Sequence, residues 1–201
     1  MKVLAIVGSP RTGGNSEILT RHTLDVISES GLETEMVSLI GLDIAPCDGC
    51  QACAEGNGCI VEDDLQPLYK KMVESQGIIL SSPVYFGSAT ARIKMVMERA
   101  GYIALRSGNP FAGKIGSPLV VGRRAGHNFT YSQLMQWFIV LGMVVPGASY
   151  WPVAIGRGKG EVESDAEGVE TARSLGMNMA TLIKAVCTAE GGSLKFSGMH
   201  R

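Results

Sequence analysis

Short apolar runs recur along the chain and are separated by longer segments in which apolar residues have helical spacing. Residues 3–7 and 77–80 are continuous apolar runs, the pattern of strands buried on both faces of a parallel sheet. Residues 115–121 predict a fourth strand and residues 143–145 a fifth. Residues 33–39 alternate weakly, which predicts a strand nearer the edge of the sheet.

Helical segments lie between these strands. We predict them at residues 16–30, from Asp63 onward, and at 90–106, 130–141 and 164–187. A strand, a tight loop and a helix open the chain, as in nucleotide-binding α/β folds. The alternation predicts an α/β fold with a flavodoxin-like, doubly wound, five-stranded parallel sheet in the order 2-1-3-4-5.

Composition narrows the class of protein. The 201 residues are 45% hydrophobic and 18% charged, with a formal net charge of −1, which suits one domain with its own core. We expect that domain at residues 1–187, with an inserted cysteine loop at 46–60 and a tail at 188–201. The basic residues are scattered, so neither nucleic acid nor a membrane is expected as partner. The short apolar N-terminal run predicts no signal peptide and a cytoplasmic protein.

Four of the five cysteines fall within thirteen residues, with the spacing C-x2-C-x2-C-x5-C. Thiolates are soft ligands for iron–sulfur clusters, zinc or copper(I). Zinc sites usually use two short pairs set apart, whereas closely spaced triplets with a near fourth cysteine are typical of ferredoxins. We therefore favour a 4Fe–4S cluster over zinc, and over free or disulfide-bonded thiols. The candidate ligands are Cys47, Cys50, Cys53 and Cys59. Cys187 is expected to be an ordinary buried thiol.

The loop after the first strand, GSPRTGGNS, covers residues 8–16. Pro10 occupies the second glycine position of a dinucleotide fingerprint, and a Walker A lysine is missing. Hydroxyls, an amide, one guanidinium and a helix N-terminus remain, and these suit the single phosphate of a mononucleotide. The groups belong to Ser9, Arg11, Thr12, Asn15 and Ser16. The alternative is a strand-to-helix turn with Ser16 as its N-cap.

The third strand leads into the loop SSPVYFGSAT. Open α/β sheets bind ligands at the carboxyl ends of their strands, and a flat heteroaromatic ring would fit against an apolar wall there. The residues of this wall are Pro83, Val84, Tyr85, Phe86 and Gly87. The alternative is that the two aromatic residues belong to the core or to an interface.

Two further segments carry candidate chemistry. The loop GRRAGHN at 122–128 follows the fourth strand, and His127 and its arginines would contact a ring or a second phosphate, or be solvated. Tyr150, Trp151 and the glycine-rich segment 156–170 predict no regular element, and exposed aromatics there would fit a subunit contact.

Three motifs follow one another on the predicted elements: GSPRTGGNS, CDGCQACAEGNGC with the acidic pair Asp63 and Asp64, and SPVYFGS. Together they resemble the iron–sulfur flavoproteins within the NADPH-dependent FMN reductase group, over about the first 125 residues. The resemblance implies FMN, its ring near residues 83–87, and a 4Fe–4S cluster on the four cysteines. It also implies a homodimer or homotetramer with the flavin near a subunit interface. The phosphate ligands it implies are Ser9, Arg11, Asn15 and Ser16.

Three hypotheses for function follow. The first is an oxidoreductase in which FMN and the cluster link two-electron to one-electron transfer, from ferredoxin or NAD(P)H to a small acceptor. The second is a cluster-free NAD(P)H-dependent FMN or quinone reductase. The third is a zinc-stabilised, non-catalytic flavodoxin-like module. No Ser-His-Asp or paired-carboxylate pattern indicates a catalytic side chain.

Overall fold

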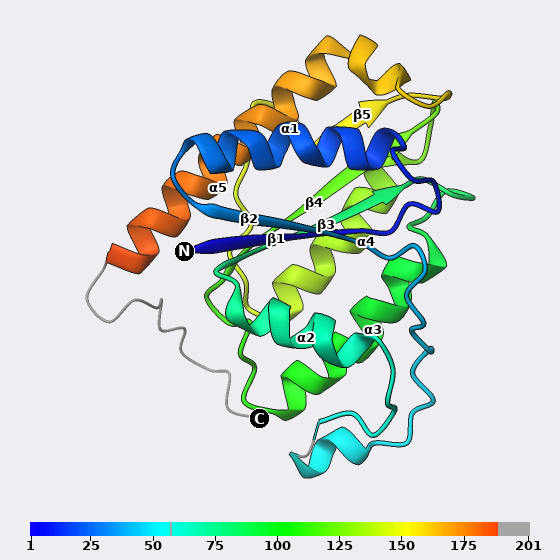
Figure 1. Ribbon diagram of the computed structural model, residues 1–201, viewed down its shortest axis with the longest axis vertical. Helices are drawn as coiled ribbons and strands as arrows, with labels where there is room; N and C mark the ends of the chain where they lie inside the picture. Colours follow the sequence, from blue (N-terminus) through cyan, green and yellow to red (C-terminus); the bar gives the residue numbers. More distant parts are fainter. Residues whose placement is uncertain (57, 189–201) are drawn as a thin grey trace.

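A parallel sheet forms the middle layer of the molecule (Figure 1). The computed structural model describes residues 1–56 and 58–188, and this part of the chain contains five strands in the order β2-β1-β3-β4-β5. The predicted fold and strand order are therefore confirmed. The strands are β1 (Lys2–Val7), β2 (Glu33–Ser38), β3 (Gly77–Pro83), β4 (Ile115–Gly122) and β5 (Val153–Ile155).

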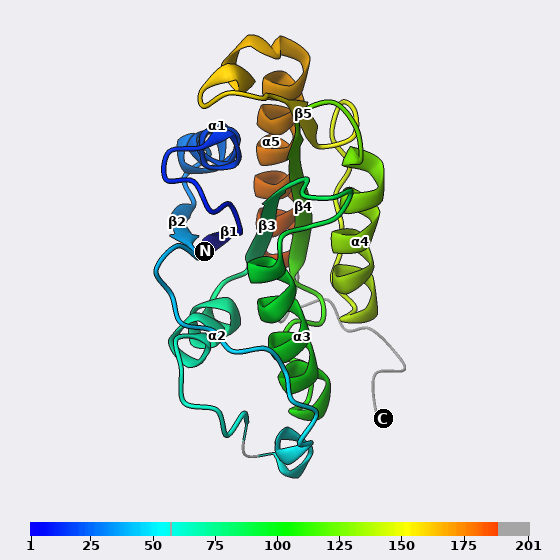
Figure 2. The same ribbon diagram turned by 90° about the vertical axis from the view of Figure 1, so that its right-hand side faces the viewer.

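Helices cover both faces of the sheet (Figure 2). Because successive residues of a strand point to opposite faces, Leu4 and Ile6 pack under α2, α3 and α4, whereas Val3 and Ala5 pack under α1 and α5. The helices are α1 (Asn15–Glu29), α2 (Leu65–Glu74), α3 (Ala91–Arg106), α4 (His127–Val140) and α5 (Ala166–Thr188), with short 3-10 helices η1 (Ala52–Glu55) and η2 (Glu161–Ser164).

The predicted fifth strand at residues 143–145 is wrong. Met143 is buried in the core below α4, and Val144 makes only an isolated bridge to Ile115. Val144 N–H donates to the Lys114 carbonyl and the Val144 carbonyl accepts the Gly116 N–H, both at 2.9 Å, so the run pairs at this one residue and does not extend into a strand. The true β5 lies in the segment where no regular element was expected, and it pairs with residues 120–122 of β4.

Several boundaries also differ from the predictions. Helix α4 begins at His127 rather than at residue 130, and α5 begins at Ala166. Ser16 is not an N-cap, because Gly14 holds that position and Ser16 lies inside α1. Cys187 is half-buried rather than buried. Of the predicted tail, residues 189–201 lie outside the described residues.

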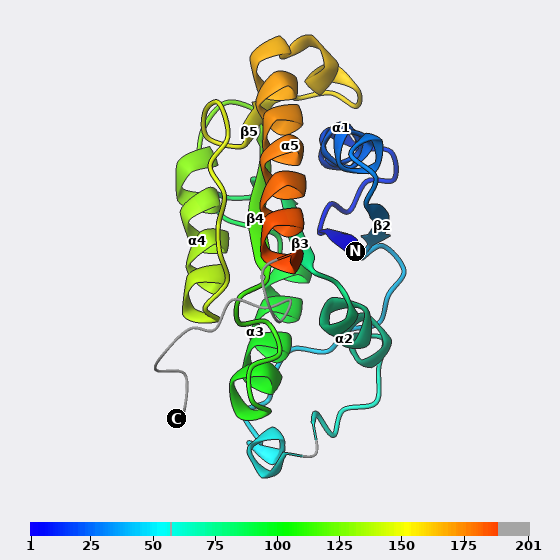
Figure 3. The same ribbon diagram turned by 90° about the vertical axis from the view of Figure 1, so that its left-hand side faces the viewer.

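The cysteine loop lies apart from the sheet. In Figure 1 the chain leaves β2 on the right and descends to η1 at the bottom of the molecule, beyond α2 and α3. Figure 3 shows η1 in the same place, below α3. Within the described residues, no helix is long and apolar enough to cross a membrane.

Candidate functional site

Three predicted loops meet at the carboxyl edge of the sheet. Register pairs Val7 of β1 with Ser81 of β3, and Pro83 of β3 with Val121 of β4. The loops that follow these strands therefore begin close together, at the same edge of the sheet. Backbone bonds continue the pairing beyond the strands: Gly8 N–H donates to the Ser81 carbonyl at 2.8 Å. Such an edge is where open α/β sheets bind ligands.

The loop between β1 and α1 is folded as a compact turn. Arg11 N–H donates to the buried Ser9 hydroxyl at 3.2 Å, and Gly14 N–H donates to the Arg11 carbonyl at 3.1 Å. Gly13 N–H donates to the Glu17 carboxylate at 2.7 Å, an interaction that the sequence did not reveal. The N–H groups of the first turn of α1 face this loop, and they favour an anion. Thr12 and the Arg11 side chain are exposed beside it.

The side chain of Asn15, a predicted phosphate contact, makes hydrogen bonds within the chain. Its side-chain amide donates to the Gly158 carbonyl at 2.8 Å and accepts the Gly160 N–H at 2.8 Å. The Asn15 side chain therefore fastens the segment before η2 over the turn. This segment places the Lys159 ammonium close to Gly13, since a Cβ built on Gly13 would lie 3.2 Å from Lys159 Nζ. Lys159 is thus a candidate phosphate contact that sequence reasoning missed, although the run RGKG was its signal.

The loop after β3 ends in a tight two-residue turn. Tyr85 N–H donates to the Ser88 carbonyl at 2.9 Å, and Ser88 N–H returns a bond to Tyr85 at 3.1 Å. Phe86 and Gly87 have φ values of 51° and 76°, as in a type I′ turn. A bulky side chain in that region is strained, and the Phe86 side chain is fully exposed at 108%. Tyr85 is 39% exposed, so neither ring belongs to the core.

Helix α4 holds this turn in place. Gln133 Oε1 accepts hydrogen bonds from the Ser88 hydroxyl at 2.9 Å and from Ala89 N–H at 3.1 Å. The loop after β4 packs on the same turn, since a Cβ on Gly126 would lie 2.8 Å from Val84 Cγ1. His127 lies against Gly122, with its Nε2 3.2 Å from the Ala154 carbonyl oxygen. This histidine therefore joins α4 to β5, while the neighbouring arginines of the loop are exposed.

The four clustered cysteines line one cavity beside α3. All five cysteines of the chain are free thiols, and Cys50 is the exposed member of the cluster. Arg99, Tyr102 and Ile103 of α3 also line this cavity. Within residues 1–56 and 58–188, no three metal-binding side chains converge as ligands of a single ion. The cavity is therefore lined by all four soft donors without a single-ion geometry.

Arg99 joins the two ends of the cysteine loop. Its guanidinium is 2% exposed and pairs with the Asp63 carboxylate. Asp63 also accepts N–H groups of Ala45, at 2.9 Å, and Leu65, at 3.0 Å. Burial alone would raise the pKa of Asp63, but Arg99 and these N–H groups hold it below its usual range. The sequence did carry a signal for Arg99, because it is a charged residue on the apolar face of a predicted helix. A buried arginine is almost always paired with an acidic group.

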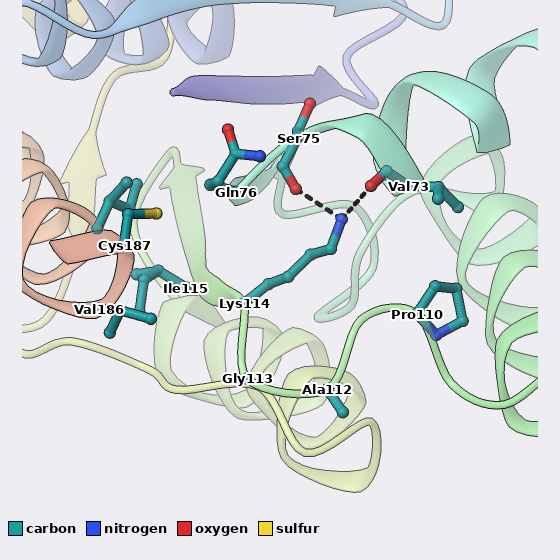
Figure 4. A pocket seen from close by; sticks show the side chains of 11 residues that line it. Val73, Ser75, Gln76, Pro110, Ala112, Gly113, Lys114, Ile115, Val186 and Cys187 are labelled. Carbon is teal, nitrogen blue, oxygen red and sulfur yellow. Dashed lines mark hydrogen bonds between the residues drawn. The ribbon is translucent and has the colours of Figure 1, made fainter. Parts of the chain in front are cut away.

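A second cavity, of about 240 Å³, lies at the opposite edge of the sheet (Figure 4). It lies between the start of β4, the turn before β3 and the end of α5, and Cys187 lines it. Lys114 points across it and donates to the Val73 carbonyl and, at 2.6 Å, to the Ser75 carbonyl. Burial lowers the pKa of Lys114 to about 8. The cysteine loop and the carboxyl-edge loops do not contribute to this cavity.

The five-stranded parallel sheet and its strand order define a flavodoxin-like protein. A family model described as NADPH-dependent FMN reductase matches residues 1–158. An iron-sulfur flavoprotein of Methanocaldococcus jannaschii is 40% identical over 193 residues, covering 92% of this chain and 99% of that protein. An iron-sulfur flavoprotein of Methanosarcina thermophila is 37% identical over 150 residues, covering 73% of this chain and 78% of that protein.

A solved structure of a flavodoxin from the domain Archaea is similar in fold alone. It has a TM-score of 0.62 at 13% identity, and the match covers 92% of this chain and 99% of the flavodoxin. This chain belongs to the iron–sulfur flavoproteins of the NADPH-dependent FMN reductase family. It is a flavin-dependent oxidoreductase, and its flavin is FMN.

Proposed function

We propose that this oxidoreductase couples FMN, bound at the carboxyl edge of the sheet, to a 4Fe–4S cluster on the cysteine loop. When bound, FMN would take up two electrons together and release them one at a time, and the cluster would exchange them singly, so the two would link two-electron to one-electron carriers. The observation that carries the proposal is the single cavity lined by all four clustered cysteines. In a cubane each thiolate binds its own iron, so the sulfurs need not converge on one ion.

The chain's own groups would bind and orient the flavin. The turn before α1 offers hydroxyl groups, a guanidinium and helix N–H groups to the phosphate. The type I′ turn would support the isoalloxazine ring. In this proposal the Asn15 side chain keeps the covering segment closed rather than touching the phosphate. The remaining proposed contacts are Ser9, Arg11, Thr12, Ser16 and Lys159 for the phosphate, and Pro83, Val84, Tyr85, Phe86 and Gly87 for the ring.

The partners and setting are part of the same proposal. The electron donor is NAD(P)H or a ferredoxin, and the acceptor is a small molecule. The protein acts in the cytoplasm. Each chain forms a single domain, and two or four chains assemble into a homodimer or homotetramer. Tyr150 and Trp151 supply apolar surface for the subunit contact: their rings lie 5.1 Å apart, and both are half exposed.

The test is the cofactor content of protein purified without oxygen. We expect one FMN and about four irons with matching sulfide per chain, together with flavin bands and a broad visible shoulder. Each Cys→Ser variant of Cys47, Cys50, Cys53 and Cys59 should lower the iron content, whereas Cys187→Ser should not.

A cluster-free NAD(P)H-dependent FMN or quinone reductase is the second candidate, because the family match spans both flavin loops. It predicts FMN and hydride oxidation with no iron. Bound zinc without flavin would contradict both candidates and indicate a structural module.

A further inference from the structure

Arg99 binds both ends of the cysteine loop with one side chain. Its Nη1 donates to the Ala45 carbonyl at 3.2 Å, and its Nη2 donates to the Val61 carbonyl at 3.2 Å. These carbonyls precede and follow the four cysteines in the chain. The guanidinium can do this because its donors form a rigid planar fork, which the single nitrogen of a lysine lacks.

The same guanidinium reaches one of the four sulfurs. Arg99 Nη2 lies 3.2 Å from Cys59 Sγ, and the arginine is 2% exposed. Among the hydrogen bonds of the described residues, Cys59 is the one clustered cysteine whose sulfur accepts from a charged side chain. Arg99 Nε is buried and has no hydrogen-bond partner among residues 1–56 and 58–188. A cation is thus fixed against one candidate ligand and shielded from water.

A charge in this position acts on electron uptake. A cluster that gains an electron gains one negative charge, and hydrogen bonds to its sulfurs help to set its potential. Low dielectric surroundings strengthen the effect of a nearby cation. Asp63 works in the opposite sense, because its carboxylate pairs with the same guanidinium and offsets its charge.

We propose that Arg99 is the positioning residue that closes the cysteine loop and, through Cys59, raises the reduction potential of the cluster held there. This inference rests on the proposed function, since it requires a cluster on the four cysteines. The Arg99–Asp63 pair would then set how readily the cluster accepts an electron. No change in the cysteines themselves would be needed to shift that potential.

The test compares two variants that are expected to shift the reduction potential of the cluster in opposite directions. In Arg99→Lys the charge is kept but the fork and its hydrogen bond to Cys59 Sγ are lost, so we expect the ratio of reduced to oxidised cluster at a fixed potential to fall about tenfold, which is about 59 mV for a one-electron couple. In Asp63→Asn the guanidinium loses its counter-charge, and that ratio should rise. Arg106→Lys is the control, since Arg106 is exposed in the last turn of the same helix. The potentials come from an anaerobic redox titration followed by visible absorption and electron paramagnetic resonance.

A second readout needs no cluster. In iron-free protein, Arg99→Lys should make cleavage within residues 46–60 by a protease several times faster, whereas Arg106→Lys should leave it unchanged. An unchanged cleavage rate in Arg99→Lys would overturn the loop-closing role.

The outcomes separate this inference from the proposed function. Wild-type protein that takes up no iron after anaerobic reconstitution would overturn the proposed function and the redox role of Arg99 with it. A wild-type cluster whose potential is the same in Arg99→Lys would overturn the inference alone. Shifts of the same sign in Arg99→Lys and Asp63→Asn would also overturn it, because general loosening of the loop would then explain both.

Discussion

At the scale of single residues, Phe86 combines a strained backbone with a fully exposed ring. A left-handed conformation costs an ordinary residue roughly 1–2 kcal/mol, and exposure of the ring leaves its apolar surface uncovered. The folded chain alone gains nothing from this arrangement. Strain of this kind is concentrated at binding sites, which agrees with a ring or a partner covering Phe86.

Replacing Phe86 by asparagine should therefore stabilise the protein and weaken flavin binding. Asparagine is favoured at the first central position of a type I′ turn, so we expect a gain of about 1 kcal/mol in the free energy of unfolding without cofactor. Loss of an aromatic contact should weaken FMN binding by up to about tenfold. Urea denaturation and flavin fluorescence titration measure the two effects.

Phe129→Asn provides the matched control, because Phe129 is an exposed phenylalanine on α4 with ordinary helical backbone. It should show neither the gain in stability nor the loss of affinity. A Phe86→Asn protein that is destabilised in the absence of flavin would contradict the argument from strain.

Lys159 should distinguish flavins by their phosphate. The lysine lies beside Gly13 in the turn before α1, where we propose that the phosphate binds, and an exposed charge pair contributes up to about 1 kcal/mol. Lys159→Met should therefore weaken FMN binding by about threefold to fivefold and leave riboflavin binding unchanged. Lys70→Met, which changes a lysine with a 78% exposed side chain on α2, is the control. Equal losses for FMN and riboflavin would exclude a phosphate contact.

At the scale of elements, Lys114 stabilises the end of α2. Its ammonium donates to the carbonyls of Met72 at 3.0 Å, Val73 and Ser75, which are the orphan acceptors at a helix C-terminus. Burial nevertheless lowers its pKa to about 8 from 10.5. Between these values the unfolded chain binds more protons at this residue, so the free energy of unfolding should rise with pH.

The stability difference between wild type and Lys114→Met should therefore grow with pH. From about pH 7.5 to about pH 9.5 we expect wild type to gain about 1 to 2 kcal/mol relative to the variant. Denaturant titrations at a series of pH values measure this difference. A constant difference would mean that the three carbonyls hold the ammonium in its charged form throughout this range.

Elements differ in how far the sequence could predict them. Apolar runs predicted β1, β3 and β4 because these strands are buried on both faces. Strand β5 has only three residues, one of them buried, so no periodicity could reveal it. Residues 143–145 show the converse case, since this apolar run pairs with β4 at Val144 alone and does not extend into a strand. The spacing of apolar residues alone does not distinguish a strand from another apolar segment.

The residues of the candidate site also differ in how far the sequence could predict them. The turn before α1 and the turn after β3 were visible because glycine and hydroxyl residues follow buried strands. Asn15 was recognised, but its bonds to residues 158 and 160 span more than 140 positions, which no local pattern reveals. Lys159 and Arg99 each left a local signal in the sequence, but their contacts with Gly13 and Asp63 are seen only in the folded chain.

At the scale of the whole molecule, the two cores are built almost entirely without the cysteine loop. Buried residues of the sheet, its five helices and the segments that connect them make both cores, and the cysteine loop adds only the half-buried Cys53 and Cys59 to one of them. Metal binding supplies most of the folding free energy only where a domain lacks a core of its own. The α/β domain should therefore stay folded when the cysteine loop holds no metal.

Removing iron with a chelator under anaerobic conditions should lower the melting temperature by no more than about 2 °C, equivalent to under about 1 kcal/mol for a domain of this size. Calorimetry should still show one cooperative transition, and the far-ultraviolet circular dichroism should be retained. Removing FMN should have the larger effect, since its proposed contacts come from several loops. Loss of cooperative melting with the iron would contradict a core independent of the loop.

Arg99 brings the carbonyls of Ala45 and Val61 to a single guanidinium, so the segment between them leaves and rejoins the domain at one point. A segment with neighbouring ends can change in length without displacing the rest of the chain. The domain could thus serve as a scaffold onto which a different metal-binding peptide is grafted between residues 45 and 61. The α/β fold and the peptide between residues 45 and 61 could then be varied independently of each other.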